Sequence, residues 1–201
     1  MSITAVGPAV YSYNPYAVGA SMFPVNPTAV GDLLVVVTDI GDSNGAHATA
    51  LSGGGVSTWV HLAGPERTTY TTLDLWMGVV TTAGPSTVTA TIAGSSVVNM
   101  YGAQQFTGGS VWSSTSAASR TNASSLSMSY PTLVPSGMNE MYVGCGASLV
   151  GVTPGSQTAG YVVASVPLHF MFNPSVSGSQ SPAAVLTSKA VSWTVGALIS
   201  G

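Results

Sequence analysis

The chain has 201 residues, of which only 4% are charged, and its formal net charge at pH 7 is −3. Three basic residues cannot neutralise a phosphate backbone or hold an anionic lipid surface, so neither nucleic acid nor a membrane surface is an expected partner. No apolar stretch reaches the roughly 18 residues that span a bilayer as a helix, and the N-terminus shows no signal-peptide pattern. We therefore expect that the protein does not insert into a membrane and that it is synthesised in the cytoplasm.

The first 27 residues contain four prolines with aromatic residues between them. Proline fixes the backbone and removes a hydrogen-bond donor, so residues 1–27 predict an extended N-terminal arm that forms an edge strand at best. The arm can fold over its own core or reach a neighbouring subunit, and aromatic side chains supply large contact areas at low entropic cost. The residues predicted to contact a neighbouring chain are Tyr11, Tyr13, Tyr16 and Phe23.

An apolar run from Gly31 to Thr38 follows the prolines and ends before Asp39. Its branched side chains and flanking turn formers predict a fully buried strand in the middle of a sheet. A related pattern, a turn with one carboxylate and then a strand, recurs from Gly137 to Cys145. We interpret the two segments as matching central strands of two packed sheets.

The remaining chain alternates short apolar strands with turns, and no segment shows the 3.6-residue apolar stripe of a helix. Residues 110–125, rich in Ser, Thr and Ala, predict a long loop or an edge crossing. The pattern as a whole predicts an all-β, two-sheet antiparallel β-sandwich with jelly-roll-like winding, formed by residues 28–201 as one domain. The residues predicted to be buried are Leu34, Val36, Leu75, Met77, Val143, Cys145 and Trp193.

The polar residues do not form a recognisable chemical motif. The oxygen-bearing residues at 39, 42 and 44 miss the spacing of a calcium loop, and the three histidines are isolated from one another. Asp32 and Glu140 each precede a strand, where a carboxylate most often caps a turn. Gly-x-Ser-x-Gly is absent, and the single cysteine reads as a small buried apolar residue. We expect no catalytic residue, cofactor or metal, and hence no enzyme.

Several short motifs occur in a characteristic order: Gly31-Asp32-Leu33-Leu34, Leu75-Trp76-Met77-Gly78, Gln105-Phe106, Asn139-Glu140-Met141-Tyr142 and Ser192-Trp193. In order and spacing they resemble a jelly-roll domain of tailed-bacteriophage virion proteins, whose members are minor tail or decoration proteins. The resemblance covers residues 28–199. The chain departs from that pattern in its depletion of charge, which puts a charged ligand site in doubt.

The resemblance implies a structural virion protein on the tail, tail tip or capsid exterior, made in the host cytoplasm and in contact with other virion proteins and the host surface. The nearly uncharged surface independently predicts a homo-oligomer, because little self-repulsion keeps copies apart. The alternative function is a carbohydrate-binding module without catalytic activity that takes a host-surface glycan. Its predicted platform is Trp76, Tyr101 and Trp112. A hydrolase is a third, weaker hypothesis.

Overall fold

The computed structural model describes residues 2–41, 44–67, 71–137, 139–155, 161–163 and 168–201. These residues form twelve β-strands and no helix, so the described chain has no helix that could cross a bilayer. In chain order the strands are β1 (Thr4–Val25), β2 (Leu33–Gly41), β3 (His47–Gly53), β4 (Val56–Arg67), β5 (Thr71–Val80), β6 (Ser86–Thr107), β7 (Ser113–Ser129), β8 (Glu140–Ser148), β9 (Val152–Pro154), β10 (Tyr161–Val163), β11 (Leu168–Val176) and β12 (Ala183–Ser200).

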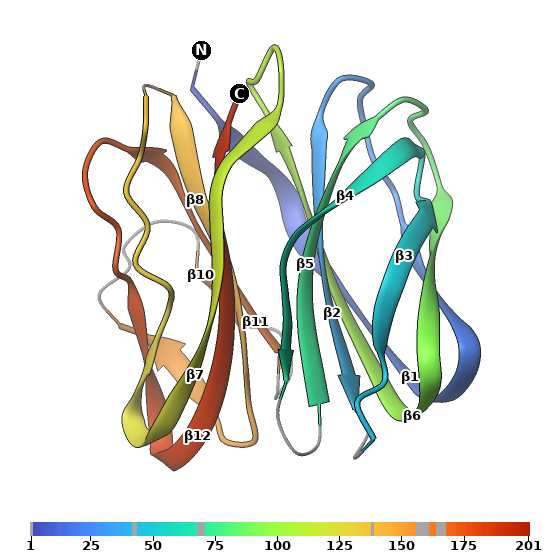
Figure 1. The fold of residues 1–201 in the computed structure, drawn as a ribbon. Coiled ribbons are helices and arrows are strands. Elements are labelled where there is room, and N and C mark those ends of the chain that lie inside the picture. The colour runs from blue at the N-terminus through green and yellow to red at the C-terminus, as the bar shows by residue number, and fades with distance from the viewer. Residues whose placement is uncertain (1, 42–43, 68–70, 138, 156–160, 164–167) are drawn as a thin grey trace.

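The strands form two antiparallel sheets that pack face to face (Figure 1). One sheet has the order β1-β6-β2-β5-β4, with β3 paired to β6, and the other has the order β10-β11-β8-β12-β7, with β9 paired to β12. The two-sheet antiparallel sandwich predicted from the sequence is therefore confirmed. The predicted central strands β2 and β8 each lie third in the order of their sheet.

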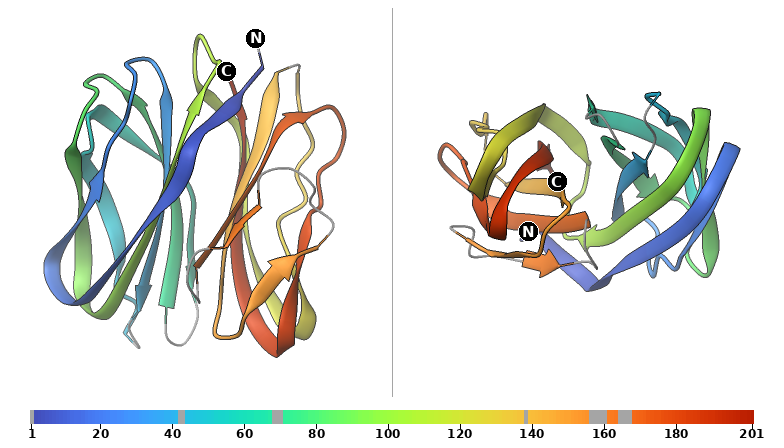
Figure 2. Two further views of the ribbon diagram at one scale, coloured as in Figure 1. Left: turned by 180° about the vertical axis from the view of Figure 1, so that it is seen from behind. Right: turned by 90° about the horizontal axis from the view of Figure 1, so that it is seen from below.

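Each sheet comes from one half of the chain, and the two halves have the same topology. Replacing each strand of the first sheet by the strand six places later reproduces the second sheet, including the extra pairing of β3 with β6 and of β9 with β12. We call β1–β6 the first unit and β7–β12 the second unit. Seen from below, the two units lie side by side (Figure 2). The same strand topology thus occurs twice in the chain, and residues 108–112 connect the two units.

The register of the strands repeats as well. Thr38 of β2 pairs with Asp74 of β5, and Gly146 of β8 pairs with His169 of β11. In each unit, the residues directly before and after Asp74 in β5 and His169 in β11 belong to the core between the units. Asp74 and His169 therefore occupy equivalent positions. The carboxylates that precede the central strands, Asp32 and Glu140, are equivalent in the same sense.

The described residues form three apolar cores, of which one is shared by the two units. The shared core lies between the two sheets and contains alternate residues of β2, β5, β8, β11 and β12. The first-unit core lies on the other face of the first sheet, and the second-unit core lies on the other face of the second sheet. Strands β2 and β8 are buried along their whole length because both of their faces meet a core. All seven predicted core residues are buried: Leu34, Val36, Leu75, Met77, Val143, Cys145 and Trp193.

The first-unit core is enclosed because two long strands bend over it. The end of β6 (residues 98–106) pairs with β2, whereas its start (residues 88–93) pairs with β3, and β1 follows it along both parts. Gly94, with φ +85°, and a register shift in β1 between Val18 and Ala20 lie at the bend. Such irregularities increase the local twist of a strand. Because of this bend, β3 lies over the outer face of the first sheet. The side chains of β4 and β5 on that face pack in the first-unit core.

Two polar segments that looked irregular in sequence are edge strands. The N-terminal segment pairs with β6 from Thr4 to Val25, so it lies against its own chain. Of the two alternatives for residues 110–125, the long loop is wrong and the edge position holds, because β7 lies at the end of its sheet and pairs with β12 along most of its length. An edge strand needs only backbone partners on one side, and few β7 side chains are buried. Its composition therefore carries no apolar alternation.

The two ends of the chain meet the link between the units. A Cβ atom added at Gly109 would lie 2.8 Å from the Cα atom of Gly201, and one added at Gly108 would lie 2.2 Å from the carbonyl oxygen of Ser2. The N- and C-terminal ends accordingly lie at the same end of the molecule (Figure 1). Glycine is needed at both positions because any side chain would collide with backbone.

Thermal unfolding should show one cooperative transition although the chain contains two units. The shared core takes side chains from both units, so separating them would expose apolar surface on each. Differential scanning calorimetry checks this, with a calorimetric enthalpy equal to the van't Hoff enthalpy as the expected result. Two resolved transitions would mean that each unit is stable with only its own core.

Candidate functional site

A pocket of about 480 Å³ lies in the first unit between β3 and β4, with β5 beneath it. Its size is within the range of small-molecule sites, about 300 to 1,000 Å³. Among the described residues, the lining contains no Lys, Arg or Glu and combines aromatic, imidazole and carboxylate groups. The residues that give it chemical character are His47, Thr49, Trp59, His61, Asp74 and Trp76.

A histidine and an aspartate are paired at the floor of this pocket. His61 of β4 lies opposite Trp76 of β5, and Asp74 is two residues before Trp76 on the same face. The imidazole packs on the Trp76 indole with ring centroids 4.4 Å apart, and its Nε2 atom lies 2.9 Å from Oδ1 of Asp74. We assign the tautomer in which Nε2–H donates to the carboxylate, which leaves Nδ1 as an acceptor.

The second oxygen of Asp74 has no hydrogen-bond partner among the described residues. The side chain is 1% exposed, and within the described chain Oδ2 accepts no hydrogen bond. Burial raises the pKa of Asp74 above its usual value, and the hydrogen bond from His61, together with the charge that His61 and His47 carry when protonated, offsets part of that rise. A buried acceptor without a donor costs about 1–3 kcal/mol of stability. The fold therefore carries a destabilising group at the bottom of an open pocket.

Two further side chains are held in place around the pocket. The Nε1–H group of Trp59 donates to the carbonyl oxygen of Gly53 over 3.1 Å, which fixes the half-buried indole against the β3–β4 turn. The Nδ1 atom of His47 lies 3.1 Å from the carbonyl oxygen of Gly45, so we assign the proton to Nδ1 and the acceptor role to Nε2. The pocket thus combines a positioned aromatic ring with several hydrogen-bond acceptors.

Sequence reasoning missed this cluster, because it treated His47 and His61 as isolated and Asp74 as one residue of an alternating strand. His61 and Asp74 belong to adjacent strands, so only the strand register brings them together. That register contains three shifts within the β4–β5 pairing. Local sequence patterns do not reveal such shifts.

The predicted glycan platform needs correction, because its three residues are buried and do not form a common surface. Tyr101 is fully buried and stacks on Phe23 with ring centroids 4.5 Å apart. Trp112 donates its Nε1–H group to the carbonyl oxygen of Gly31 over 2.8 Å. Trp76 is 5% exposed because the face of β5 that was expected to meet solvent meets the first-unit core. Of the three, only Trp76 borders the pocket described above.

The aromatic residues predicted to contact a neighbouring subunit separate into two pairs. Tyr13 and Tyr16 are 64% and 65% exposed on β1. Phe23 lies in the first-unit core, and Tyr11 packs against the shared core. A contact with a neighbouring chain stays a prediction for Tyr13 and Tyr16, whereas Phe23 and Tyr11 pack within their own chain.

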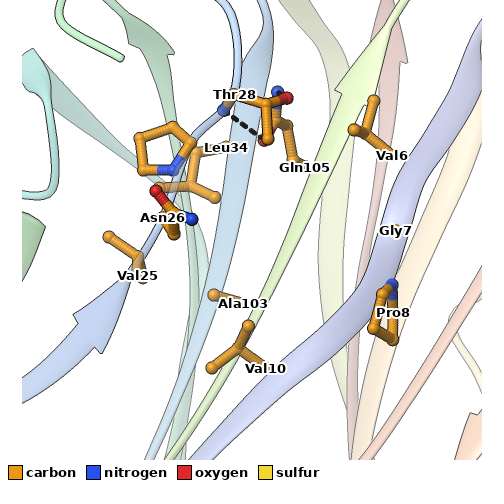
Figure 3. Close-up of a pocket in the computed structure, with 11 residues that line it drawn as sticks. Val6, Gly7, Pro8, Val10, Val25, Asn26, Thr28, Leu34, Ala103 and Gln105 are labelled. Carbon is orange, nitrogen blue, oxygen red and sulfur yellow. Dashed lines mark hydrogen bonds between the residues drawn. The ribbon is translucent and has the colours of Figure 1, made fainter. Parts of the chain in front are cut away.

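A second, smaller pocket of about 210 Å³ lies between the start of β1 and the segment before β2 (Figure 3). Its polar group is the Gln105 amide, whose Oε1 atom accepts from the backbone N–H of Thr28 over 3.0 Å. The same amide donates to the Thr28 hydroxyl and to Asp32. Asp32 and Gln105 therefore have partners within the protein, and the rest of the lining is mainly apolar.

Glu140, the counterpart of Asp32, also has a structural role. Its carboxylate accepts hydrogen bonds from the backbone N–H and the hydroxyl of Ser136, over 2.9 and 3.0 Å. Burial raises the pKa of Glu140, but hydrogen bonds from Thr115, Ser136 and Gly137 outweigh it and bring the pKa below its usual value. Both carboxylates thus close the turn before a central strand.

Within the described ranges, no three His, Cys, Asp or Glu side chains gather closely enough to hold a metal ion. Cys145 is buried in the shared core, where burial raises the pKa of its thiol. Neither a model of a known protein family nor a curated protein matches the chain.

Proposed function

We propose that this chain is a structural protein of a tailed-phage virion, a minor tail or exterior decoration protein that assembles with copies of itself and with other virion proteins. The sequence resemblance supports the assignment to a virion. On this proposal the protein is synthesised in the host cytoplasm and is then located on the virus particle. The observation that carries assembly is the exposed surface of β1. On this proposal the host surface is a further partner of the assembled particle.

Strand β1 is a 22-residue edge strand without a single charged residue. Its solvent-facing apolar side chains include Tyr13, Tyr16, Val18 and Met22, each more than 60% exposed. Exposed edges of this length are a hazard for a free monomer, and proteins usually protect them with charges, prolines or bulges. Here three prolines and two register shifts limit indiscriminate strand pairing, but no charge prevents a side-chain contact. Such a surface fits a chain whose β1 is covered in an assembly.

The opposite edge of the sandwich gives a similar picture. β7 has one charged residue, Arg120, among its 17 residues, and Ser, Thr and Ala dominate its exposed surface. Contacts between such edges depend on apolar burial and hydrogen bonds, so salt should affect assembly little. Symmetric homo-oligomers are the usual way in which identical copies cover such patches, and a virion imposes threefold, fivefold or sixfold positions.

The assembly proposal is tested by placing charges on β1. We expect the unmodified protein to form a closed oligomer in light scattering, and the double variant Val18→Lys and Met22→Lys to be monomeric with an unchanged circular dichroism spectrum. Lysine at these exposed positions keeps the strand but adds repulsion between copies. Val134→Lys is the matched control, because Val134 is 66% exposed outside β1.

An unmodified protein that is monomeric at high concentration would contradict the proposal, and so would a double variant that assembles like the control. Deleting residues 2–24 is a poorer experiment, because it would remove Phe23 from the first-unit core and expose β6. Labelling of intact particles with an antibody against the chain tests the virion location itself.

A further inference from the structure

We propose that the pocket between β3 and β4 binds one ring of a neutral pyranose sugar. The inference does not rest on the virion assignment, since a sugar-binding monomer would refute assembly and leave this site in place. It starts from Asp74, a residue of the pocket lining whose Oδ2 atom is buried and accepts no hydrogen bond within the described chain. A hydroxyl group of a bound ligand would supply the missing donor.

The repeated fold shows that this carboxylate is not needed for the architecture. The equivalent position in the second unit holds His169, and the equivalent of Trp76 is Met171. Both units reach the same winding, so neither Asp74 nor the indole beside it is required by the strand pairing. His169 and Asp39 also carry buried polar atoms without a partner in the described chain, but of these three residues only Asp74 lines this pocket, where a ligand can supply the partner.

The lining matches the two faces of a sugar ring. Trp59, Leu51 and Pro65 offer apolar surface to ring C–H groups, with the Trp59 indole held by its bond to Gly53. The polar groups of the lining are mainly acceptors, namely the Asp74 carboxylate, Nδ1 of His61 and the Thr49 hydroxyl, which itself donates to Thr91. Acceptors suit a ligand rich in O–H donors.

The charge of the lining selects against acidic sugars. The described lining contains no Lys or Arg, and its one acidic side chain is Asp74. With His47 and His61 neutral, as assigned above, a uronic or sialic acid would bring a second carboxylate toward Asp74 without a cation to pair with it. A neutral ring has no such penalty, so the site should prefer neutral pyranoses over their acidic counterparts.

The test follows the indole N–H signals of the four tryptophans by NMR while methyl glycosides of glucose, galactose, mannose and N-acetylglucosamine are added to the full chain. At the efficiency usual for small ligands, a single ring should saturate the Trp59 signal with a Kd on the order of 1 mM. Glucuronic acid should bind at least about tenfold more weakly than the best neutral sugar, because of the carboxylate in the pocket.

Two variants at the site and one control make the result specific. Trp59→Ala and Asp74→Asn should each weaken binding about tenfold or more, since one removes the platform and the other the charged acceptor. The asparagine variant keeps the shape of the side chain, so it remains informative if the alanine variant is poorly folded. Trp112→Phe is the control, because Trp112 lies outside this pocket.

The proposal is overturned if none of the four glycosides gives a saturable shift at about a hundred times the expected Kd. It is also overturned if Trp59→Ala and Asp74→Asn bind like the unmodified protein, or if glucuronic acid binds best. Tetramethylammonium is an added probe, because a carboxylate beside indole rings can also hold a cation. Preference for that cation over every sugar would reject the sugar assignment.

Discussion

Replacing Trp193 with alanine should lower the free energy of unfolding by about 3–5 kcal/mol, the loss typical of a large aromatic side chain in a core. Trp193 is 8% exposed and packs in the shared core, where β12 faces the first unit. The sheet leaves little room to collapse around the cavity, because Trp193 pairs with Ala147 on one side and Thr121 on the other. Urea unfolding followed by fluorescence measures the loss.

Val191→Ala on the same strand is the matched control. Val191 is 40% exposed, so its truncation should change stability by less than about 1 kcal/mol. Equal losses at positions 191 and 193 would show that Trp193 is not part of the core. Because both changes lie in β12, any difference in strand propensity between them is small compared with the expected gap.

The change in the free energy of unfolding caused by Asp39→Asn should be more favourable at pH 8 than at pH 4, by up to about 4 kcal/mol. Asp39 is 1% exposed in the middle of the sheet, and burial raises its pKa from 3.8 to about 7. The Thr71 hydroxyl donates to Oδ1, whereas Oδ2 has no partner in the described part of the chain. Asparagine keeps the acceptor for Thr71 and never becomes charged.

The direction of this pH dependence follows because the pKa of Asp39 is higher in the folded state than in the unfolded state. Below pH 3.8 the folded and unfolded states both carry the protonated acid, so the group costs nothing; its contribution to stability then falls as the pH rises from about 4 to about 7. The Asp39→Asn variant has no carboxyl group at this position and therefore lacks this loss of stability. Urea unfolding of both proteins at pH 4 and pH 8 measures the difference. An equal effect of the substitution at both pH values would mean that the pKa of Asp39 is not raised.

The sequence predicted the central part of the fold because its signals there are local. The apolar runs of β2 and β8 gave two buried central strands, and the shared pattern of carboxylate, turn and strand was a trace of the repeat. Val88, Ala90 and Ile92 alternate with threonines in the sequence, and all three are buried in β6. These features depend on neighbours within a few residues, where side-chain period is informative.

The edges and the pocket could not be predicted, because they depend on long-range register. β7 has no apolar alternation, yet its backbone pairs with β12. Trp76 and Tyr101 looked like candidates for an exposed platform only because a second core on the outer face of the sheet was not expected. The His61–Asp74 pair likewise needs the shifted register of β4 and β5. A simple two-sheet sandwich has one core between its sheets, whereas the described residues of this chain form three.

The meeting of Ser2, Gly109 and Gly201 gives the molecule a direction. One pole carries both chain ends and the crossing between the units, and the other pole carries none of them (Figure 1). In a ring related by rotation, every copy has the same tilt to the axis, so all ends emerge at the same height. Any segment fused to either end would therefore be displayed on a single rim of the ring.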